Sequence, residues 1–546
     1  MGSYVIVTKA NNRDYLKDYV ALPKDYGKSS YFSRPDIQDI YEVVYRNLDA
    51  LDAHTKFTNE MKNRHVIIKP NLVSVFYKIG FKDDAYPEST DPRVIDAVIS
   101  YVKKYTNQIT LVESSGRGMP TRTSFKVAGI DRLARFHQIQ LIPLEEEPVE
   151  RYLLPKAQIM NEMMVPRILT QVIRQEAYYI SIPKMKTNLY TGVTLGFKNA
   201  MGSIPYNLRQ RNHNYHINKK LVDILYCYKP NLVIIDGIIG GEGNTPAPVD
   251  PVRSHVIISG NNSVETDWVG TKFMGIDPES IELLTEAKRL GFGDKEVKVI
   301  GEIEPVPFRK ADQTLLSAYF RTQFPNVRYF VGHSLKHSKQ FDSIDEIDQN
   351  IVKLIEKECV GGCLAAMRQG FEMFFYEGLN NSFPLAVVIG SGTVVDGKPV
   401  YFDVDGKSYS SEDILKLDMK VLAFGSCTKA FVGTKALQIN GCMPMPTASL
   451  KALHKLTGQT NRLYSTKNKQ LLKLGLGALK MRHNRISMTK KGLWMDVLPS
   501  YSDDRIHKFE DISESQKSLD YIHAPLPPLE GEAKKTLLRD VRRNSF

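Results

Sequence analysis

Residues 178–188 read Tyr178-Tyr-Ile-Ser-Ile182-Pro-Lys184-Met-Lys186-Thr-Asn188, and the fold of the chain depends on how this stretch is interpreted. Its first five residues are apolar or β-forming and predict a buried strand, which a proline ends. Lys184 and Lys186 then follow at the carboxyl end of that strand. A buried strand that releases charged residues at this end is typical of a parallel sheet with a ligand site along the same edge.

The pattern of short β-rich runs separated by amphipathic helices extends through residues 64–300. Apolar runs predict strands at 66–68, 109–112, 232–235 and 255–258, and helical periodicity predicts helices at 92–105 and 217–228. The first 63 residues add a strand (4–7) and a helix (37–51). The sequence therefore predicts an α/β domain with a mainly parallel sheet over residues 1–308.

Two further regions are expected in a chain of 546 residues. Residues 309–460 contain predicted strands at 386–389, 400–404 and 421–424 and predicted helices at 344–375 and 447–456. They indicate a second, smaller α/β domain. Residues 461–546 are predicted to form a basic C-terminal extension, and beyond about residue 497 we expect an extended or loosely ordered polar tail.

The composition, with 42% hydrophobic and 25% charged residues, is that of an ordinary globular protein. No run approaches the roughly 18 to 20 apolar residues that span a bilayer. The first residues read as a strand rather than as a signal peptide. Five cysteines in a chain of this length exclude a disulfide framework. We therefore expect a cytoplasmic protein.

Polar residues follow five of the predicted strands at the point where each strand ends. In chain order they are Lys69 and Asn71, Glu113, Lys184 and Lys186, Asp236 and Glu242, and Asp267. Because the carboxyl ends of parallel strands meet at one edge of a sheet, we expect these side chains to form a common ligand site. Lys184, Lys186 and Asp236 are the candidates for catalysis, and the other residues are candidates for binding the substrate.

A glycine-rich segment, Thr191-Gly-Val-Thr-Leu-Gly-Phe-Lys198-Asn199-Ala-Met-Gly202, supplies two more substrate-binding candidates, Lys198 and Asn199. Its glycines allow close approach of a ligand to the backbone, and Lys198 offers a cation at the start of a predicted helix, as in phosphate and carboxylate sites. The spacing is not that of a Walker loop. The lysines indicate an anionic substrate, or a lysine of lowered pKa that acts as a base.

The acidic candidates leave two interpretations open: the four carboxylates could bind a divalent cation, or they could neutralise the lysines in a buried network. The polar run at residues 209–216 is predicted as a loop that contacts ligand or solvent, with His213 as a candidate general acid or base. A metal-binding pair of His213 and His216 is the alternative for this run.

Six segments resemble, in the same order, the signature segments of the family called domain of unknown function 362. They are Lys69-Pro-Asn-Leu-Val73, Thr90-Asp-Pro92, Pro183-Lys-Met-Lys-Thr187, Gly196-Phe-Lys-Asn-Ala-Met-Gly202, Leu232-Val-Ile-Ile-Asp-Gly-Ile238 and Met274-Gly-Ile-Asp-Pro278. The resemblance covers about residues 64–300 and implies a fold and a site but no reaction. It also implies an iron–sulfur association, which is frequent in that family. Asn188 departs from the family pattern, in which a histidine usually follows Lys-Thr, whereas Glu242 keeps the usual acid.

Four of the five cysteines lie in the second predicted domain, at Cys359, Cys363, Cys427 and Cys442. Their number matches the ligand count of a [4Fe–4S] centre or of another metal site such as structural zinc. Their spacing is not that of a ferredoxin, so the motif alone does not assign them. The alternative is that they are small buried hydrophobic residues.

Residues 451–495 carry nearly the whole net charge of +12. They contain no acidic residue and eleven basic ones, which are Lys451, Lys455, Arg462, Lys467, Lys469, Lys473, Lys480, Arg482, Arg485, Lys490 and Lys491. Residues 467–491 combine this charge with leucines, and such a segment could lie on an anionic membrane surface. A helix packed on the domain with a solvated basic face is the alternative, and nucleic acid is the least favoured partner.

These features predict a metal- or iron–sulfur-dependent enzyme, oxidoreductase-like, that acts on an anionic small molecule at the carboxyl ends of the strands. The cysteines would deliver or receive electrons. One alternative is a non-redox enzyme, isomerase- or ligase-like, that uses a divalent cation held by the carboxylates. Another is a noncatalytic metal or iron–sulfur binding protein.

Overall fold

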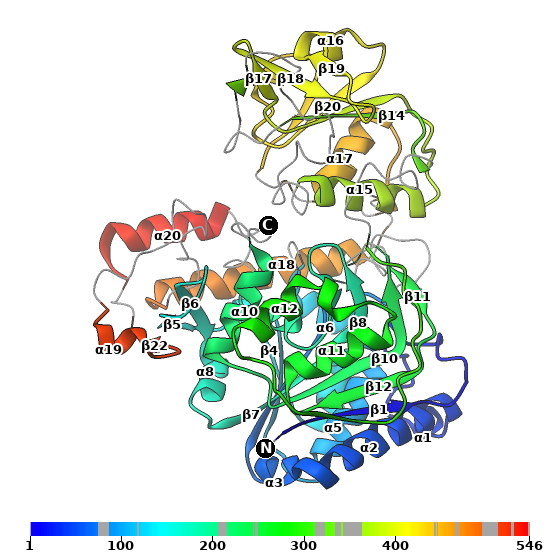
Figure 1. Ribbon diagram of the computed structural model, residues 1–546, viewed down its shortest axis with the longest axis vertical. Coiled ribbons are helices and arrows are strands. Elements are labelled where there is room, and N and C mark those ends of the chain that lie inside the picture. Colours follow the sequence, from blue (N-terminus) through cyan, green and yellow to red (C-terminus); the bar gives the residue numbers. More distant parts are fainter. Residues whose placement is uncertain are drawn as a thin grey trace. The chain divides into compact units, whose positions relative to one another are not determined.

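The computed structural model describes residues 2–74, 87–116, 119–205, 216–243, 245, 249–311, 323–332, 340–341, 363–441, 444, 446–462, 465, 468, 470–493, 512–525 and 529–543 (Figure 1). The chain divides into two compact units. The first joins residues from the first 311 with residues from 469 onward, and the second is formed mainly by residues 312–468. The predicted C-terminal extension is thus grouped largely with the first unit rather than standing apart.

The large sheet of the first unit has the strand order β13-β1-β12-β10-β7-β2-β3-β4. In that order the strands are Val297–Ile300, Ser3–Lys9, Val256–Gly260, Leu232–Glu242, Ala177–Ile182, His65–Pro70, Ile109–Glu113 and Gln140–Pro143. The five strands from β10 to β4 run parallel. Every residue of β7 and β3 is buried, as expected for parallel strands covered on both faces. The predicted mainly parallel α/β fold is confirmed.

Helices cover the two faces of this sheet because successive strand residues point to opposite sides. On one face Thr8 of β1 meets Asn47 of α2 (Pro35–Thr55), which packs on α5 (Pro92–Val102). On the other face Ile235 of β10 lies against α11 (Ser263–Phe273). The helix α5 starts where the sequence favours it, since the Asp91 carboxylate accepts a hydrogen bond from the Arg93 amide and Pro92 occupies the first turn.

One predicted strand runs in the opposite direction from the others. The strand β12 is antiparallel to both β10 and β1, so the residues that follow it lie at the opposite edge of the sheet. The described residues between β10 and β12 hold the short strand β11 (Asp250–Val252) and no helix, and such a connection suits antiparallel neighbours. The expectation that all five strands release polar residues at one edge is therefore wrong for the fifth strand.

The second unit contains an eight-stranded sheet with the order β15-β17-β18-β14-β16-β20-β21, and β19 pairs with β18. These strands are Gln340–Phe341, Thr393–Val395, Lys398–Phe402, Val327–Val331, Leu385–Ile389, Lys420–Phe424, Leu437–Ile439 and, for β19, Ser408–Ser410. The α-helices in the described part of this unit are α15 (Ala365–Tyr376), α16 (Ser411–Lys416) and α17 (Pro446–Thr457). The second predicted α/β fold is confirmed. Most of the predicted helix at 344–375 lies outside the described residues.

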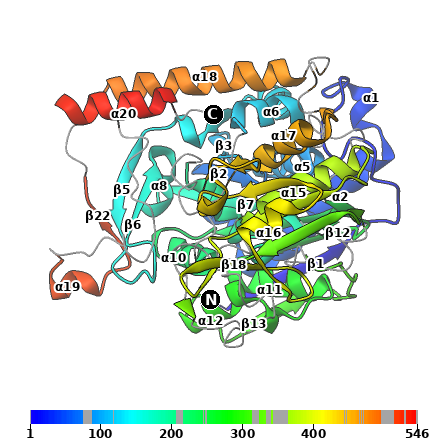
Figure 2. The ribbon, with the colours of Figure 1, turned by 90° about the horizontal axis from the view of Figure 1, so that it is seen from above.

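The C-terminal residues form regular structure on the first unit. The helix α18 (Gln470–Lys490) packs on α6 (Thr121–Ala128), and α20 (Gly531–Arg543) lies beside α18 (Figures 1 and 2). The strand β22 (Ile522–His523) joins a small sheet with β5 (Val149–Leu153) and β6 (Glu162–Pro166). The expectation of an extended tail beyond about residue 497 is wrong for β22 and α20. At α20, three apolar residues in a polar stretch, Leu529, Leu537 and Val541, are buried against Ile486 of α18.

None of the helices that the structure describes combines the length and the apolar character that crossing a bilayer requires.

Candidate functional site

Charged side chains from neighbouring parallel strands meet at the carboxyl edge of the large sheet. Lys69 lies near the end of β2 and Glu113 ends β3. Lys184 opens β8 (Lys184–Asn188), two residues after the end of β7, and Asp236 lies within β10. All four are at most 1% exposed. We call these residues, together with Lys186, Lys198 and Asn199, the strand-end cluster.

The first ion pair of the cluster joins Lys69 and Glu113. The Lys69 Nζ lies 2.9 Å from Glu113 Oε1 and donates to Asn199 Oδ1 at 2.8 Å. The Glu113 carboxylate also accepts hydrogen bonds from the backbone amides of Leu72 and Ser114, both at 2.8 Å. A Cβ on Gly202 would overlap Glu113 Oε1 and lie 2.7 Å from Lys69 Nζ, so the last glycine of the predicted cradle is required by this contact.

The second ion pair joins Lys184 and Asp236, whose Nζ and Oδ2 atoms are 2.9 Å apart. The same Oδ2 accepts the backbone amide of Asp91 at 2.7 Å. The Asp91 side chain in turn pairs with Arg93, which is completely buried, through an NH2–Oδ2 distance of 2.6 Å. Two buried charge pairs are thus linked through the backbone at the start of α5.

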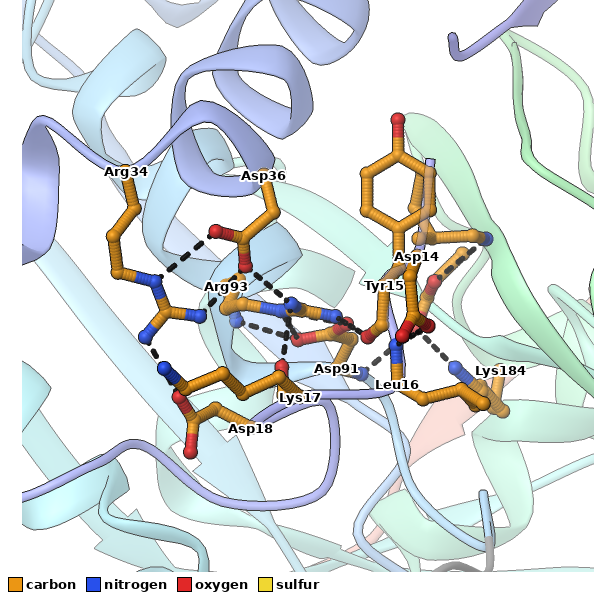
Figure 3. A network of polar contacts seen from close by, with 12 residues as sticks. Asp14, Tyr15, Leu16, Lys17, Asp18, Arg34, Asp36, Asp91, Arg93 and Lys184 are labelled. Carbon is orange, nitrogen blue, oxygen red and sulfur yellow. Dashed lines mark hydrogen bonds and ion pairs between the residues drawn. The ribbon is translucent and has the colours of Figure 1, made fainter. Parts of the chain in front are cut away.

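The buried guanidinium of Arg93 extends this network toward the N-terminal segment, as Figure 3 shows. It donates to the carbonyl oxygens of Tyr15 at 2.7 Å and Lys17 at 2.8 Å, and to Asp36 Oδ2 at 3.1 Å. Asp36 also accepts from Arg34 at 2.7 Å. Arg34, Asp36, Arg93 and Asp91 thus form a continuous series of alternating charges that ends at Asp236 of the strand-end cluster. The guanidinium groups in this series all donate to oxygen atoms.

Lys186 is a buried lysine whose pKa is lowered by its surroundings. Its ammonium group donates to the carbonyl oxygen of Glu88. Burial, followed by the nearby charge of Lys198, lowers the pKa of Lys186 to about 7, and Lys184 acts in the same direction. The carboxylates of Glu88 and Glu113 act against this shift without reversing it. At neutral pH a large fraction of Lys186 is therefore the neutral amine, whereas an ordinary surface lysine is almost entirely protonated.

Three buried polar atoms in this part of the sheet have no hydrogen-bond partner among the residues that the structure describes. They are Asn71 Oδ1, Thr194 Oγ1 and Tyr179 Oη. Thr194, in β9 (Gly192–Thr194), lies opposite Lys186 in the strand register, and the Glu113 charge acts on Tyr179. An unsatisfied buried polar atom is costly, and in proteins such atoms usually find a partner in ordered water or in a ligand.

The remaining predicted acids lie apart from these two ion pairs. Glu242, at the end of β10, accepts the backbone amide of Arg309 at 2.8 Å. Asp267, inside α11, accepts the amides of Gly196 at 2.6 Å and Phe197 at 3.1 Å, and burial raises its pKa to about 8. Asp267 therefore holds the backbone from which the Lys198–Asn199 turn starts.

The structure does not bring the four predicted acids to one point. Within the described part of the chain, no group of three or more His, Cys, Asp or Glu side chains is placed to hold a metal ion. Glu113 and Asp236 instead neutralise lysines, which is the second of the two interpretations that the sequence left open. His213 lies outside the described residues.

Sequence reasoning missed Glu88, Asp91 and Arg93 as parts of the site. Thr90-Asp-Pro92 was noticed only as a segment of the family resemblance. The sequence does hold a signal for Arg93, because this residue directly precedes the apolar stripe of α5 and is therefore expected to be buried. A buried arginine requires an acidic or carbonyl partner. Its partners could not be named, because two of them are backbone carbonyls 76 and 78 residues earlier.

Two of the four predicted cysteine ligands converge in the second unit. Cys363 lies just before α15, and Cys427 follows β20. A Cβ on Gly425, whose φ of 110° favours glycine, would lie 3.4 Å from both sulfur atoms, and the carbonyl oxygen of Gly441 is 3.8 Å from the same point. The two sulfur atoms therefore lie close to the same glycine, on segments far apart in the sequence. Cys359 and Cys442 lie outside the described residues.

Comparison with known proteins finds similarity over part of this chain. A thylakoid-associated protein of Synechocystis sp. is 29% identical over 118 residues, which are 20% of this chain and 37% of that protein. The match thus spans little more than a third of the relative. No solved structure matches the chain. A family model described as "Domain of unknown function (DUF362)" matches residues 66–272, so this segment, which contains the whole strand-end cluster, belongs to the domain of unknown function 362 family.

Proposed function

We propose that this protein is a metal- or iron–sulfur-dependent enzyme, oxidoreductase-like, that binds an anionic small molecule at the strand-end cluster and moves a proton through Lys186. The observation that carries the proposal is a completely buried lysine with a pKa of about 7 beside two other lysines, Lys184 and Lys198. A group with its pKa near the working pH is effective as a general acid or base. Such shifts are frequent at functional sites.

The charge of Lys198 couples ligand binding to the protonation of Lys186. Without an anion, burial and then the charge of Lys198 keep the pKa of Lys186 low, so much of Lys186 is a neutral amine. An anion bound at Lys198 would offset that charge and raise the pKa of Lys186. The protonated Lys186 could then donate this proton to the bound molecule, and water would reprotonate the amine. The unpartnered Asn71 and Thr194 oxygens would orient the bound molecule.

Lys198→Ala tests the proposed anion site. The wild-type protein is purified without denaturation, and the small molecules that it retains are identified by untargeted mass spectrometry. We expect an anionic compound in the wild type and its loss from Lys198→Ala, because the cation that attracts it is gone. The matched control is Lys219→Ala, a half-buried lysine whose charge acts on Glu286 instead, and it should retain the compound. Equal retention by both variants would remove the anion site from the proposal.

The cysteines of the second unit are the proposed metal site. A metal centre or iron–sulfur cluster there would supply one-electron transfer, and Cys363 and Cys427 would be two of its ligands. We expect Cys363→Ser and Cys427→Ser each to lower the metal bound per chain in anaerobically purified protein by more than half. Cys227→Ser is the matched control, since Cys227 is buried in α10 (Ile217–Cys227) of the first unit. A wild-type protein free of iron and zinc would refute the metal site.

A non-redox enzyme, isomerase- or ligase-like, is the second candidate. It is favoured by the same residue, because proton transfer through Lys186 needs no electron carrier. Retention of the anionic compound by a protein that binds no metal would support this candidate. Metal retention without turnover of any retained compound would instead support a noncatalytic metal-binding protein.

We further propose that the chain works in the cytoplasm and contacts a membrane surface peripherally. The relative from Synechocystis is named for its association with thylakoids, which are membranes. The basic residues 451–495 supply the charge that an anionic surface attracts.

A further inference from the structure

The helix α18 exposes a leucine stripe on one face, although its opposite face is docked on the first unit. Leu472, Leu476 and Leu479 are 68%, 58% and 56% exposed. Their spacing of four and then three residues places them on one face of the helix, over about two turns. Three adjoining exposed leucines are unusual on a soluble surface, where single exposed apolar residues are common.

The opposite face of α18 fixes the direction in which this leucine stripe points. Ala478 and Met481 are buried, and Gly477 lies so close to Thr123 of α6 that a Cβ there would overlap its hydroxyl. Farther along, the Asn484 amide donates to Glu146 Oε2 at 2.5 Å. The helix therefore cannot rotate its leucines inward without breaking this packing.

The surroundings of the leucine stripe carry positive charge. Lys473 and Lys480 flank it on α18 and are exposed, and α18 contains no acidic residue. The helix α20, which packs against α18 at Ile486, carries the exposed side chains of Arg539 and Arg542, while its Lys535 pairs with Glu532. An apolar stripe bordered by lysines suits the boundary between acyl chains and anionic headgroups, where both parts are satisfied. It suits a protein partner less well, because the fully buried parts of protein interfaces are depleted in charge.

We propose that α18 is the membrane-contacting element of this protein and lies on an anionic lipid surface, with Leu472, Leu476 and Leu479 at the acyl boundary. The inference rests on the proposed peripheral location and names the surface responsible for it. Lys473 and Lys480 would pair with lipid phosphates at the rim of the stripe. The geometry requires no opening of the fold, since the leucines already face outward.

Vesicle flotation with the full-length protein tests this proposal. The vesicles are phosphatidylcholine alone or phosphatidylcholine mixed with phosphatidylglycerol. We expect the wild type to float with the mixed vesicles only. The triple variant Leu472→Gln, Leu476→Gln, Leu479→Gln should bind them roughly tenfold more weakly or worse, because the apolar contribution is lost while the charge is kept. Leu519→Gln, at a single leucine that is 47% exposed, is the matched control and should bind like the wild type.

The outcomes separate this inference from the proposed location. If the wild type binds no vesicle, the peripheral location itself fails and the inference falls with it. If the wild type and the triple variant bind equally, the location stands and α18 is not the element responsible. A change of the triple variant in size-exclusion chromatography, without a change in vesicle binding, would show that the leucines instead contact another part of the chain or a second copy, and would also overturn the inference.

Discussion

Arg93→Met is expected to lower the free energy of unfolding by about 3–5 kcal/mol, which is the usual cost of removing one partner from a buried charge pair. The change leaves the buried Asp91 carboxylate without its guanidinium, and the carbonyls of Tyr15 and Lys17 lose a charged donor. Methionine fills much of the same volume, so the loss measures charge and hydrogen bonding rather than a cavity. Urea unfolding followed by circular dichroism gives the value.

The matched control for this change is Arg46→Met in α2. Arg46 pairs with Glu42 on the surface, where the side chains are 55% and 65% exposed, and the expected loss is below about 1 kcal/mol. The double variant Asp91→Asn, Arg93→Met should recover part of the loss, because the uncompensated charge is gone while an amide can still cap α5. Equal losses for Arg93→Met and Arg46→Met would show that the network of Figure 3 contributes little to stability.

The sequence predicts well the features that depend on neighbours along the chain. Alternating strands and helices are local patterns. Lys69 near the end of β2 and Lys184 just after β7 lie at the same sheet edge because those strands are parallel. The direction of β12 is not local. It depends on the connection from β10, in which residues 244 and 246–248 lie outside the described part. The apolar pattern of a buried strand is the same for both strand directions. The sequence therefore places the polar residues that follow β12 at the wrong edge of the sheet.

The same limit explains the rest of the site. Asp267 and Glu242 look like equivalent strand-end acids in the sequence, yet one holds the Gly196 backbone and the other contacts Arg309. Charge alone does not reveal which partner a carboxylate will meet when that partner is 67 or 71 residues away. The convergence of Cys363 and Cys427 on Gly425 likewise brings together residues from different elements of the second unit. Spacing along the chain carries no sign of it.

Lys186→Met is expected to change how stability depends on pH. In the folded protein the pKa of Lys186 is about 7, and its ordinary value is 10.5, so between these limits the unfolded chain binds more protons than the folded one. Stability therefore rises with pH across this window, by about 1.4 kcal/mol per unit for one such residue. The difference in free energy of unfolding, wild type minus Lys186→Met, should therefore increase by roughly 2–3 kcal/mol between about pH 7 and pH 9.5.

The difference between the two proteins isolates Lys186, because other groups that titrate in this range are common to both and largely cancel. Lys220→Met is the positive control, since burial also lowers the pKa of Lys220 to about 7 and the sign is the same. Lys220 differs in that no charge of the strand-end cluster contributes to its shift, so its variant should keep the bound anionic compound. A difference between wild type and Lys186→Met that stays flat with pH would mean that Lys186 remains protonated throughout. Proton transfer through this residue would then be ruled out, even if the anion still binds beside it.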